Sequence, residues 1–284
     1  MEVLSDILRS MRVTGSVYFC DSLDSPWSME FADTDRASFH LVRRGECWIT
    51  SGDTHERLGP GDFVFIEPGR DHVLANELSG EPENAQSTTT LLLCGYGKFE
   101  GPKGHALLKT LPSLTIIRDE ELLQQRWLKS TLDQLSTEYL TRQPGSEVVV
   151  DKLTEVLIVE LIRINFGRSE QSGFTRALFD EQISRALELM HTAPEKSWTL
   201  ESLASRVAMS RAAFAKRFKE HVGQTMFEYL TTLRMQRAQI LLRESNLPLY
   251  EVASRVGYQS DLAFAKSFKR FVGLTPTSYR RLPS

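Results

Sequence analysis

Two stretches of the chain, "ASRVAMSRAAFAKRFKEHVGQT" at residues 204–225 and "ASRVGYQSDLAFAKSFKRFVGLT" at residues 253–275, are near copies of each other. When Ser210 is placed opposite Ser260, ten of the sixteen positions through Thr225 and Thr275 are identical. Unrelated sequences would match at about one position in twenty. The chain therefore contains an internal repeat, and its two copies are too few for a solenoid.

Each copy predicts two helices joined by a tight turn. Apolar residues with the i, i+3, i+4, i+7 spacing of a one-sided helix come before the turn: Leu200, Leu203, Ala204 and Val207, then Leu249, Val252, Ala253 and Val256. Ser210 and Ser260 follow the turn, where an N-cap accepts from the free amides of the next helix. That helix carries two phenylalanines on one side and ends before a glycine. We expect helix-turn-helix units at about residues 199–222 and 248–272.

The side of the second helix opposite the phenylalanines carries small and basic residues. Small side chains let a helix lie deep in a major groove, and lysines reach base edges or phosphates. The alternative is a helical bundle without a DNA-binding role, in which the exposed lysines only increase solubility. The residues expected to face DNA are Arg211, Ala212, Ala215, Lys216 and Lys219 in the first copy, and Asp261, Leu262, Ala265, Lys266 and Lys269 in the second.

Charge separates the two halves of the chain. Residues 175–284 contain 17 lysines and arginines against 10 aspartates and glutamates, a net charge of +7, and the remainder carries −10, which together give −3. A basic half joined to an acidic half indicates that one end meets a polyanion. Between the copies, "TMFEYLTTLRMQRAQILLRES" predicts a helix of roughly 30 Å. Successive major-groove faces on one side of DNA lie about 34 Å apart, so one chain could fill two adjacent grooves.

"LRMQRAQILLRES" and "VASRVGYQSDLAFAKSFKRFVGLTPTSYRR", together with the first copy, resemble the DNA-binding domain of the AraC/XylS family of bacterial transcription regulators. The resemblance covers residues 180–282 or so. It implies an all-α domain that binds double-stranded DNA, with Ala212, Ala215 and Lys216, and then Leu262, Ala265 and Lys266, at the base-facing positions. The sequence departs from the family at Met226, where the first unit often has proline.

The acidic half has a different pattern. "FHLV", "ECWIT", "DFVFI", "HVLA" and "TTLLLCG", within residues 37–96, predict short antiparallel strands of a barrel or sandwich. Residues 119–166 then become helical. "GRSEQSG" is polar and follows this helical region, which makes it the expected linker. We predict an N-terminal domain at 1–166, a linker at 167–174 and a C-terminal domain at 175–284.

"FHLVRRGECWI", "LGPGDFVFIEPGRDHVLAN" and the later "LLLCGYGKFEG" and "HALLKTLP" resemble the cupin-type sensor domain found in one branch of the same family. The resemblance implies a ligand pocket in the barrel mouth, with His40, Trp48 and His72 as candidates. A cupin metal site normally draws on three histidines and a carboxylate. Here the motifs offer only His40 and His72, with Glu46 as the carboxylate, so we expect neither a metal nor another cofactor.

The three cysteines, Cys20, Cys47 and Cys94, lack the spacing of a metal site and fit a reduced compartment. Cys20 and Cys94 are candidates for oxidant sensing, although most lone cysteines are inert small hydrophobes. The start of the chain has no apolar run typical of a signal peptide, and "VLIVELI" is too short to span a membrane. We expect a cytoplasmic protein, associated with the nucleoid when bound to DNA.

These observations predict a sequence-specific DNA-binding transcription regulator, an activator, whose N-terminal domain senses a small molecule or an oxidant. We expect it to pair as a homodimer through the helices near residues 122–140 and 148–166, to contact RNA polymerase, and to have no enzymatic activity. Two alternatives belong to other classes. One is a cupin metalloenzyme, such as a dioxygenase or isomerase, with an appended helical domain. The other is a DNA-architectural protein with little sequence preference.

Overall fold

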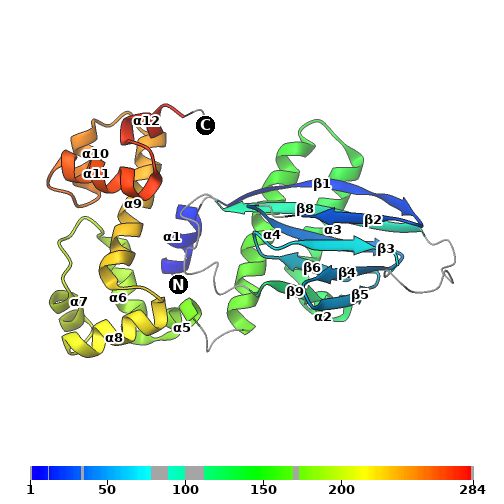
Figure 1. The fold of residues 1–284 in the computed structure, drawn as a ribbon, viewed down its shortest axis with the longest axis horizontal. Coiled ribbons are helices and arrows are strands. Elements are labelled where there is room, and N and C mark those ends of the chain that lie inside the picture. Colours follow the sequence, from blue (N-terminus) through cyan, green and yellow to red (C-terminus); the bar gives the residue numbers. More distant parts are fainter. Residues whose placement is uncertain are drawn as a thin grey trace. The chain divides into compact units, whose positions relative to one another are not determined.

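The computed structural model of the chain describes residues 2–11, 13–32, 35–77, 89–99, 112–168 and 173–282. These residues form two compact units (Figure 1). One unit contains all the strands and helices α2 to α4. The other contains helices α5 to α12 together with the N-terminal helix α1.

The β unit consists of two sheets, and every strand pairing in them is antiparallel. The five-stranded sheet has the order β1 (Val13–Asp24), β8 (Thr89–Phe99), β3 (Ala37–Arg44), β6 (Phe63–Ile66) and β9 (Leu114–Ile117). The four-stranded sheet has the order β2 (Ser28–Phe31), β7 (His72–Ala75), β4 (Cys47–Ser51) and β5 (Thr54–Leu58). All five predicted segments are strands, and β1, β2, β5 and β9 add to them.

A hydrophobic core lies between the two sheets, because alternate residues of each strand point to the same side. Its fully buried members are Val42, Cys47, Ile49, Leu58, Val64, Ile66, Leu74, Leu92 and Cys94. The outer face of the five-stranded sheet is covered by helices. At Gly15 and Gly97, where a side chain would meet Thr154 and Ile158, α4 (Ser146–Arg168) lies directly against β1 and β8. The expected antiparallel cupin-like fold followed by helices is confirmed.

Three helices follow the strands, as the sequence predicted for residues 119–166. They are α2 (Asp119–Gln124), α3 (Arg126–Thr141) and α4. The linker predicted at 167–174 overlaps the end of α4, which reaches Arg168, and the start of α5 at Gly173. Its middle, residues 169–172, lies outside the described residues. Most of the cupin-like segment "HALLKTLP" also lies outside them.

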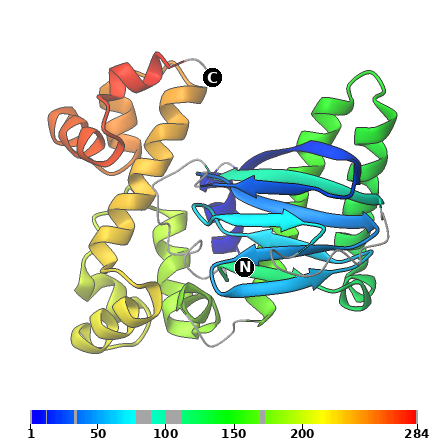
Figure 2. The ribbon, with the colours of Figure 1, turned by 45° about the vertical axis from the view of Figure 1, so that its right-hand side comes forward.

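The second unit is entirely helical in its described part. Its helices are α5 (Gly173–Phe179), α6 (Glu181–Thr192), α7 (Leu200–Arg206), α8 (Arg211–Val222), α9 (Met226–Glu244), α10 (Leu249–Arg255), α11 (Asp261–Val272) and α12 (Pro276–Arg280). The long helix α9, yellow to orange in Figure 2, runs between the first group of helices and the second. None of the helices in the described ranges is both long and apolar enough to cross a membrane.

Helix α1 (Glu2–Met11) was assigned by sequence to the N-terminal domain, but it packs with the helical unit. It contacts α6 and α9. Its apolar side chains Val3, Ile7 and Met11 are buried at that contact. The sequence placed this helix in a domain at 1–166, whereas in the structure its one-sided apolar stripe is covered by helices that come much later in the chain.

Candidate nucleic-acid interface

The two copies of the repeat fold as two helix-turn-helix units, α7–α8 and α10–α11. In both, the serine before the second helix caps it. The Ser210 hydroxyl accepts from the amide of Ala213 at 3.2 Å, and the Ser260 hydroxyl accepts from the amide of Ala263 at 3.4 Å. Each helix ends at a glycine with positive φ, 78° and 85°. The caps and the stop signals thus set the ends of α8 and α11.

Matched aromatic pairs fix the inward face of α8 and α11. Phe214 and Phe218 are fully buried with ring centroids 5.6 Å apart, and Phe264 and Phe268 repeat the same 5.6 Å separation. Burying two aromatic rings one turn apart determines the rotation of each helix about its axis. The remaining side of each helix consequently faces solvent at equivalent positions in the two units.

The residues predicted to face DNA lie on this solvent side. Ala215 and Ala265 are half-buried at its edge, and the others are exposed: Arg211, Ala212, Lys216, Lys219, Asp261, Leu262, Lys266 and Lys269. Leu262 has 78% of its surface exposed, an unusual position for a large apolar side chain. In the first unit Arg211 forms an ion pair with Glu201 of α7 at 2.7 Å, which holds its guanidinium against the neighbouring helix.

The two turns place different residues at the left-handed position that follows the shared "ASRV". Gly257 has a φ of 81°, a left-handed conformation that glycine adopts freely. The equivalent residue of the first unit, Ala208, has a φ of 54°. An L-residue in this region is strained by about 1–2 kcal/mol. No local pattern indicates this strain, since alanine is not a typical turn residue.

Ala208→Gly is therefore expected to stabilise the helical unit. The relieved strain outweighs the larger entropy of glycine in the unfolded chain, leaving a gain of about 0.5–1 kcal/mol. The free energy of unfolding, measured by urea denaturation of the full chain, checks this. The matched change Ala213→Gly, in the first turn of α8, relieves no strain and should destabilise the unit. A loss of stability in Ala208→Gly would contradict the conformation of this turn.

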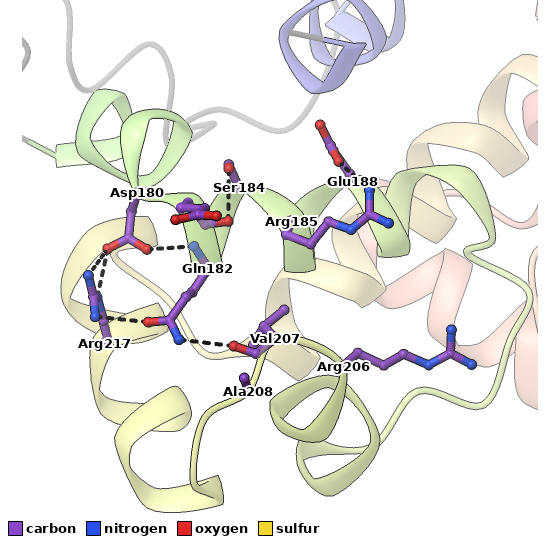
Figure 3. Close-up of a pocket in the computed structure, with 10 residues that line it drawn as sticks. Asp180, Gln182, Ser184, Arg185, Glu188, Arg206, Val207, Ala208 and Arg217 are labelled. Atoms are coloured by element: carbon purple, nitrogen blue, oxygen red, sulfur yellow. Dashed lines mark hydrogen bonds and ion pairs between the residues drawn. The ribbon is translucent and has the colours of Figure 1, made fainter.

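Asp180, just before α6, connects that helix to the first unit (Figure 3). Its carboxylate caps α6 by accepting from the amides of Gln182 at 3.1 Å and Ile183 at 3.0 Å. The same carboxylate accepts from Arg217 of α8 at 2.6 Å, and only 4% of its side chain is exposed. Burial acts to raise the pKa of Asp180, but the Ile183 amide and Arg217 outweigh it and hold the pKa below its ordinary value.

Gln182 extends this anchor to the turn. Its amide donates to the carbonyl of Val207 at 3.0 Å, and its oxygen accepts from Arg217 at 3.2 Å. These groups line a pocket of about 630 Å³ beside the strained residue Ala208. The start of α6 thereby holds both the turn and α8. The sequence analysis missed Asp180 and Gln182, because their partners lie about 25 to 37 residues away and leave no local pattern.

Two substitutions of Asp180 separate its roles. Asp180→Ala removes the cap and the ion pair and should lower the free energy of unfolding by about 2–3 kcal/mol. Asp180→Asn keeps a good capping residue and should cost about half as much. The exposed neighbour Glu181→Ala is the control. Because the folded pKa is depressed, the contribution of Asp180 is present above pH 4 and is lost as the pH falls through that pKa. Urea denaturation at pH 7 and pH 3 measures both effects, and equal losses at the two values would contradict the ion pair.

Arg234, in the middle of α9, connects the two groups of helices. Its guanidinium donates to the carbonyl of Pro194 at 2.8 Å and to the carbonyl of Lys196 at 2.8 Å, in the loop between α6 and α7. On its other side it lies 5.9 Å from the ring of Tyr258 in the turn of the second unit. Arg234 was not predicted from the sequence, although its position fixes the second turn relative to the first group of helices.

Two of the predicted sensing residues meet in the interior of the β unit. His40 on β3 and His72 on β7 are buried, and their Nε2 atoms are 2.8 Å apart, which is a hydrogen bond between the two rings. Phe31 stacks on His72 at 4.6 Å. Burial lowers the pKa of both histidines, and for His40 the neighbouring imidazole lowers it further. Both rings are accordingly neutral at pH 7.

The donor set of a cupin metal centre does not assemble around this pair. Within the ranges that the structure describes, no group of three or more histidine, cysteine, aspartate or glutamate side chains is placed to hold a metal. Glu46, the carboxylate offered by the motif, is half-exposed and pairs with Arg57. Val42 is buried where a further histidine would be needed. Two imidazole rings that are hydrogen-bonded to each other do not provide the ligand set of a metal ion.

Cys20 and Cys94 lie on opposite faces of the five-stranded sheet. Cys94 is opposite Phe19 on β1, whereas Cys20 is opposite Leu93. Opposed residues of antiparallel strands share a face, so Cys20 and Cys94 point to opposite faces and are not placed to form a disulfide with each other. Cys94 shares the interior core with Cys47, which the sequence analysis did not select. Burial raises the pKa of all three thiols, that of Cys47 to about 12.

Trp48 points away from these groups. It alternates along β4 with Cys47 and Ile49, which are both in the interior core, and it remains partly exposed. It therefore lies on the outer face of the four-stranded sheet. Among the five residues predicted for sensing, the interior of the β unit brings together His40, His72 and Cys94 and leaves Trp48 and Cys20 outside.

Comparisons with known proteins agree with this arrangement. Residues 2–167 match a family model described as cupin, and residues 203–282 match one described as a helix-turn-helix domain. The HTH-type transcriptional regulator AlkR of Acinetobacter baylyi is 30% identical over 99% of both chains. The RCS-specific HTH-type transcriptional activator RclR of Escherichia coli is 25% identical over 99% of this chain and 97% of its own.

Among solved structures, the C-terminal domain of AraT, a response regulator from Geobacillus stearothermophilus, is 31% identical over 37% of this chain and 89% of its own, with a TM-score of 0.36. The named relatives are regulators rather than cupin enzymes. The chain belongs to the AraC-type family of DNA-binding transcriptional regulators, in the branch that joins an N-terminal cupin domain to a C-terminal helix-turn-helix domain.

Proposed function

We propose that one chain regulates transcription by placing α8 and α11 in two adjacent major grooves of the same duplex. The observation that carries this proposal is the repetition of one outward face on two helices with the same buried aromatic pair. Helix α9, with 19 residues, gives a rod of roughly 28 Å between the units. The ten predicted residues from Arg211 to Lys269 provide the contacts.

The contacts divide by chemistry. Lys216, Lys219, Lys266 and Lys269 are the groups for phosphates and base edges. Ala212 and Leu262 occupy the equivalent position in the two units, and their apolar side chains suit the methyl group of thymine. Leu262 reaches further than Ala212, so the second helix should discriminate more strongly for thymine at this position.

Selection of bound duplexes from a random pool tests the proposal. The full chain should enrich a site with two conserved blocks about ten base pairs apart, centre to centre. An architectural protein would enrich no sequence. The Leu262→Ala variant should relax the base preference in one block and leave the other unchanged, while Leu282→Ala, which removes an exposed leucine outside the two recognition helices, should change neither block.

We further propose that the N-terminal unit receives the signal, as a small molecule or as an oxidant. The buried set of His40, His72 and Cys94 supports this, because adding an oxygen to Cys94 would place a polar group in an apolar core. Burial raises the pKa of the Cys94 thiol, and because the thiolate is the reactive form, Cys94 should react slowly with mild oxidants. Repeating the selection with reduced and oxidised protein, and with Cys20→Ser and Cys94→Ser, tests this input. A response that survives in both variants would remove the cysteines from the proposal.

Exposed apolar side chains on α2, α3 and α4 support a homodimer. They are Leu123, Trp127, Leu140, Val148, Val149 and Val156, with Trp127 exposed over 77% of its surface. Large apolar side chains exposed on three neighbouring elements of the chain are what a protein interface would cover. Equilibrium sedimentation of the full chain should give a dimer for the wild type and for the control Asp53→Lys, which changes an exposed charge in the turn between β4 and β5, and a monomer for Trp127→Glu. The Escherichia coli relative is named a transcriptional activator, which supports activation as the role of this chain. In this proposal the chain binds DNA in the cytoplasm and activates transcription by contacting RNA polymerase.

A further inference from the structure

The N-terminal helix α1 is built to dock on the DNA-binding unit. Val3, Ile7 and Met11 recur every four residues, and each is no more than 2% exposed. Ser5 and Arg9, on the other side, are exposed. The buried stripe contacts α6 and α9. An isolated helix of ten residues is marginal in water, so these contacts are what keep residues 2–11 helical.

A polar connection accompanies the apolar one. The Asp6 carboxylate of α1 lies 3.6 Å from Nδ1 of His191 on α6, within range of an electrostatic interaction. Nε2 of His191 is 2.8 Å from the hydroxyl of Tyr229 on α9. His191 and Tyr229 are both buried. Burial raises the pKa of Tyr229, and the charge of Asp6 raises it further, so the phenol stays protonated.

Tyr229 also contacts α8, the recognition helix of the first unit. Its ring meets Phe218 of α8 edge-on at 5.9 Å and lies 6.2 Å from Phe174 of α5. Phe218 is one of the two aromatic residues that set the rotation of α8. A continuous set of packed and hydrogen-bonded groups therefore runs from Asp6 through His191 and Tyr229 to Phe218.

We infer that α6 and α9 form a helix-binding surface whose occupant is the chain's own residues 2–11, and that the docked helix holds α8 in its DNA-binding position. The strand β1 begins at Val13, two residues after α1 ends. The element that supports the first recognition helix is therefore continuous with the first strand of the β unit. This goes beyond the proposed function, which needs only α8, α9 and α11.

The experiment compares two full-length variants with the same added charge. Ile7→Glu puts a carboxylate into the buried stripe, and Ser5→Glu puts one on the exposed side of the same helix. Hydrogen exchange is measured in residues 183–192 and 226–238, and affinity is measured on a selected DNA site. Ile7→Glu should exchange at least tenfold faster in both segments and bind DNA about fivefold more weakly. Ser5→Glu should match the wild type in exchange and stay within twofold in affinity.

A peptide of residues 1–12 tests the surface directly. Added to the Ile7→Glu protein, the wild-type peptide should restore the slow exchange, and a peptide carrying the same Ile7→Glu change should not. Unchanged exchange in the Ile7→Glu protein would overturn the docking. Faster exchange with equal or tighter DNA binding would overturn the supporting role of α1. The exchange measurement involves no DNA, so a failure of the proposed function would not be mistaken for a failure of this inference.

Discussion

Gly257→Ala is expected to lower the free energy of unfolding of the DNA-binding unit by about 3 kcal/mol. Part of the loss, about 1–2 kcal/mol, is the strain of alanine at a φ of 81°. The rest comes from crowding. A Cβ at this position would lie 2.7 Å from Nη2 of Arg234 and 2.8 Å from the carbonyl oxygen of Glu195. Arg234 would have to give up its bonds to the carbonyls of Pro194 and Lys196.

The matched control is Gly273→Ala. Gly273 has nearly the same φ, 85°, but a Cβ there would meet nothing within 4 Å. This variant should therefore show the strain alone, about 1–2 kcal/mol. Hydrogen exchange of the slowest amides in α9 and α11, which report the stability of their own unit, measures both variants. Equal losses in the two would show that Gly257 is not packed against Arg234.

The second large effect concerns the basic residues of the two recognition helices. Lys216→Ala and Lys266→Ala should each weaken binding to a selected DNA site about tenfold near 0.1 M salt and should reduce the slope of log affinity against log salt concentration by about 1. The Lys216 side chain is 79% exposed, and the distance from its Nζ to the Glu220 carboxylate is a long 3.9 Å, so its charge remains available to a phosphate.

Lys98→Ala provides the control for charge alone. Lys98 is exposed on β8 of the β unit, outside the recognition helices and the helices proposed to form the dimer. Its removal should leave both the affinity and the salt slope unchanged. If neither recognition-helix variant altered the salt slope, the proposed orientation of α8 and α11 on DNA would be wrong.

The parts of the molecule that could be predicted from the sequence are those with local signals. The repeat, the caps at Ser210 and Ser260, and the paired phenylalanines define both helix-turn-helix units within about twenty residues each. Strands made of a short apolar run between turn-forming residues, such as β3 and β6, were predicted as well. Strand β2, with the sequence "SMEF", was missed because it is short and its side chains are half exposed.

The remaining features depend on contacts between distant residues. Nothing near Asp180 or Arg234 in the sequence indicates that each joins segments about 40 residues apart. The sequence assigned α1 to the N-terminal domain because this helix comes directly before the strands. In the structure its apolar stripe packs against α6 and α9. Cys20 and Cys94 were grouped by chemistry, but strand register places them on opposite faces of one sheet.

The reading of two adjacent grooves by one chain is tested most directly by hydroxyl-radical footprinting of the full-length protein on a selected site. For each bound chain, we expect two protected segments on one side of the duplex, about ten base pairs apart. Lys216→Ala should weaken one of them and Lys266→Ala the other. A single protected segment per chain, or protection that both variants weaken equally, would contradict the account.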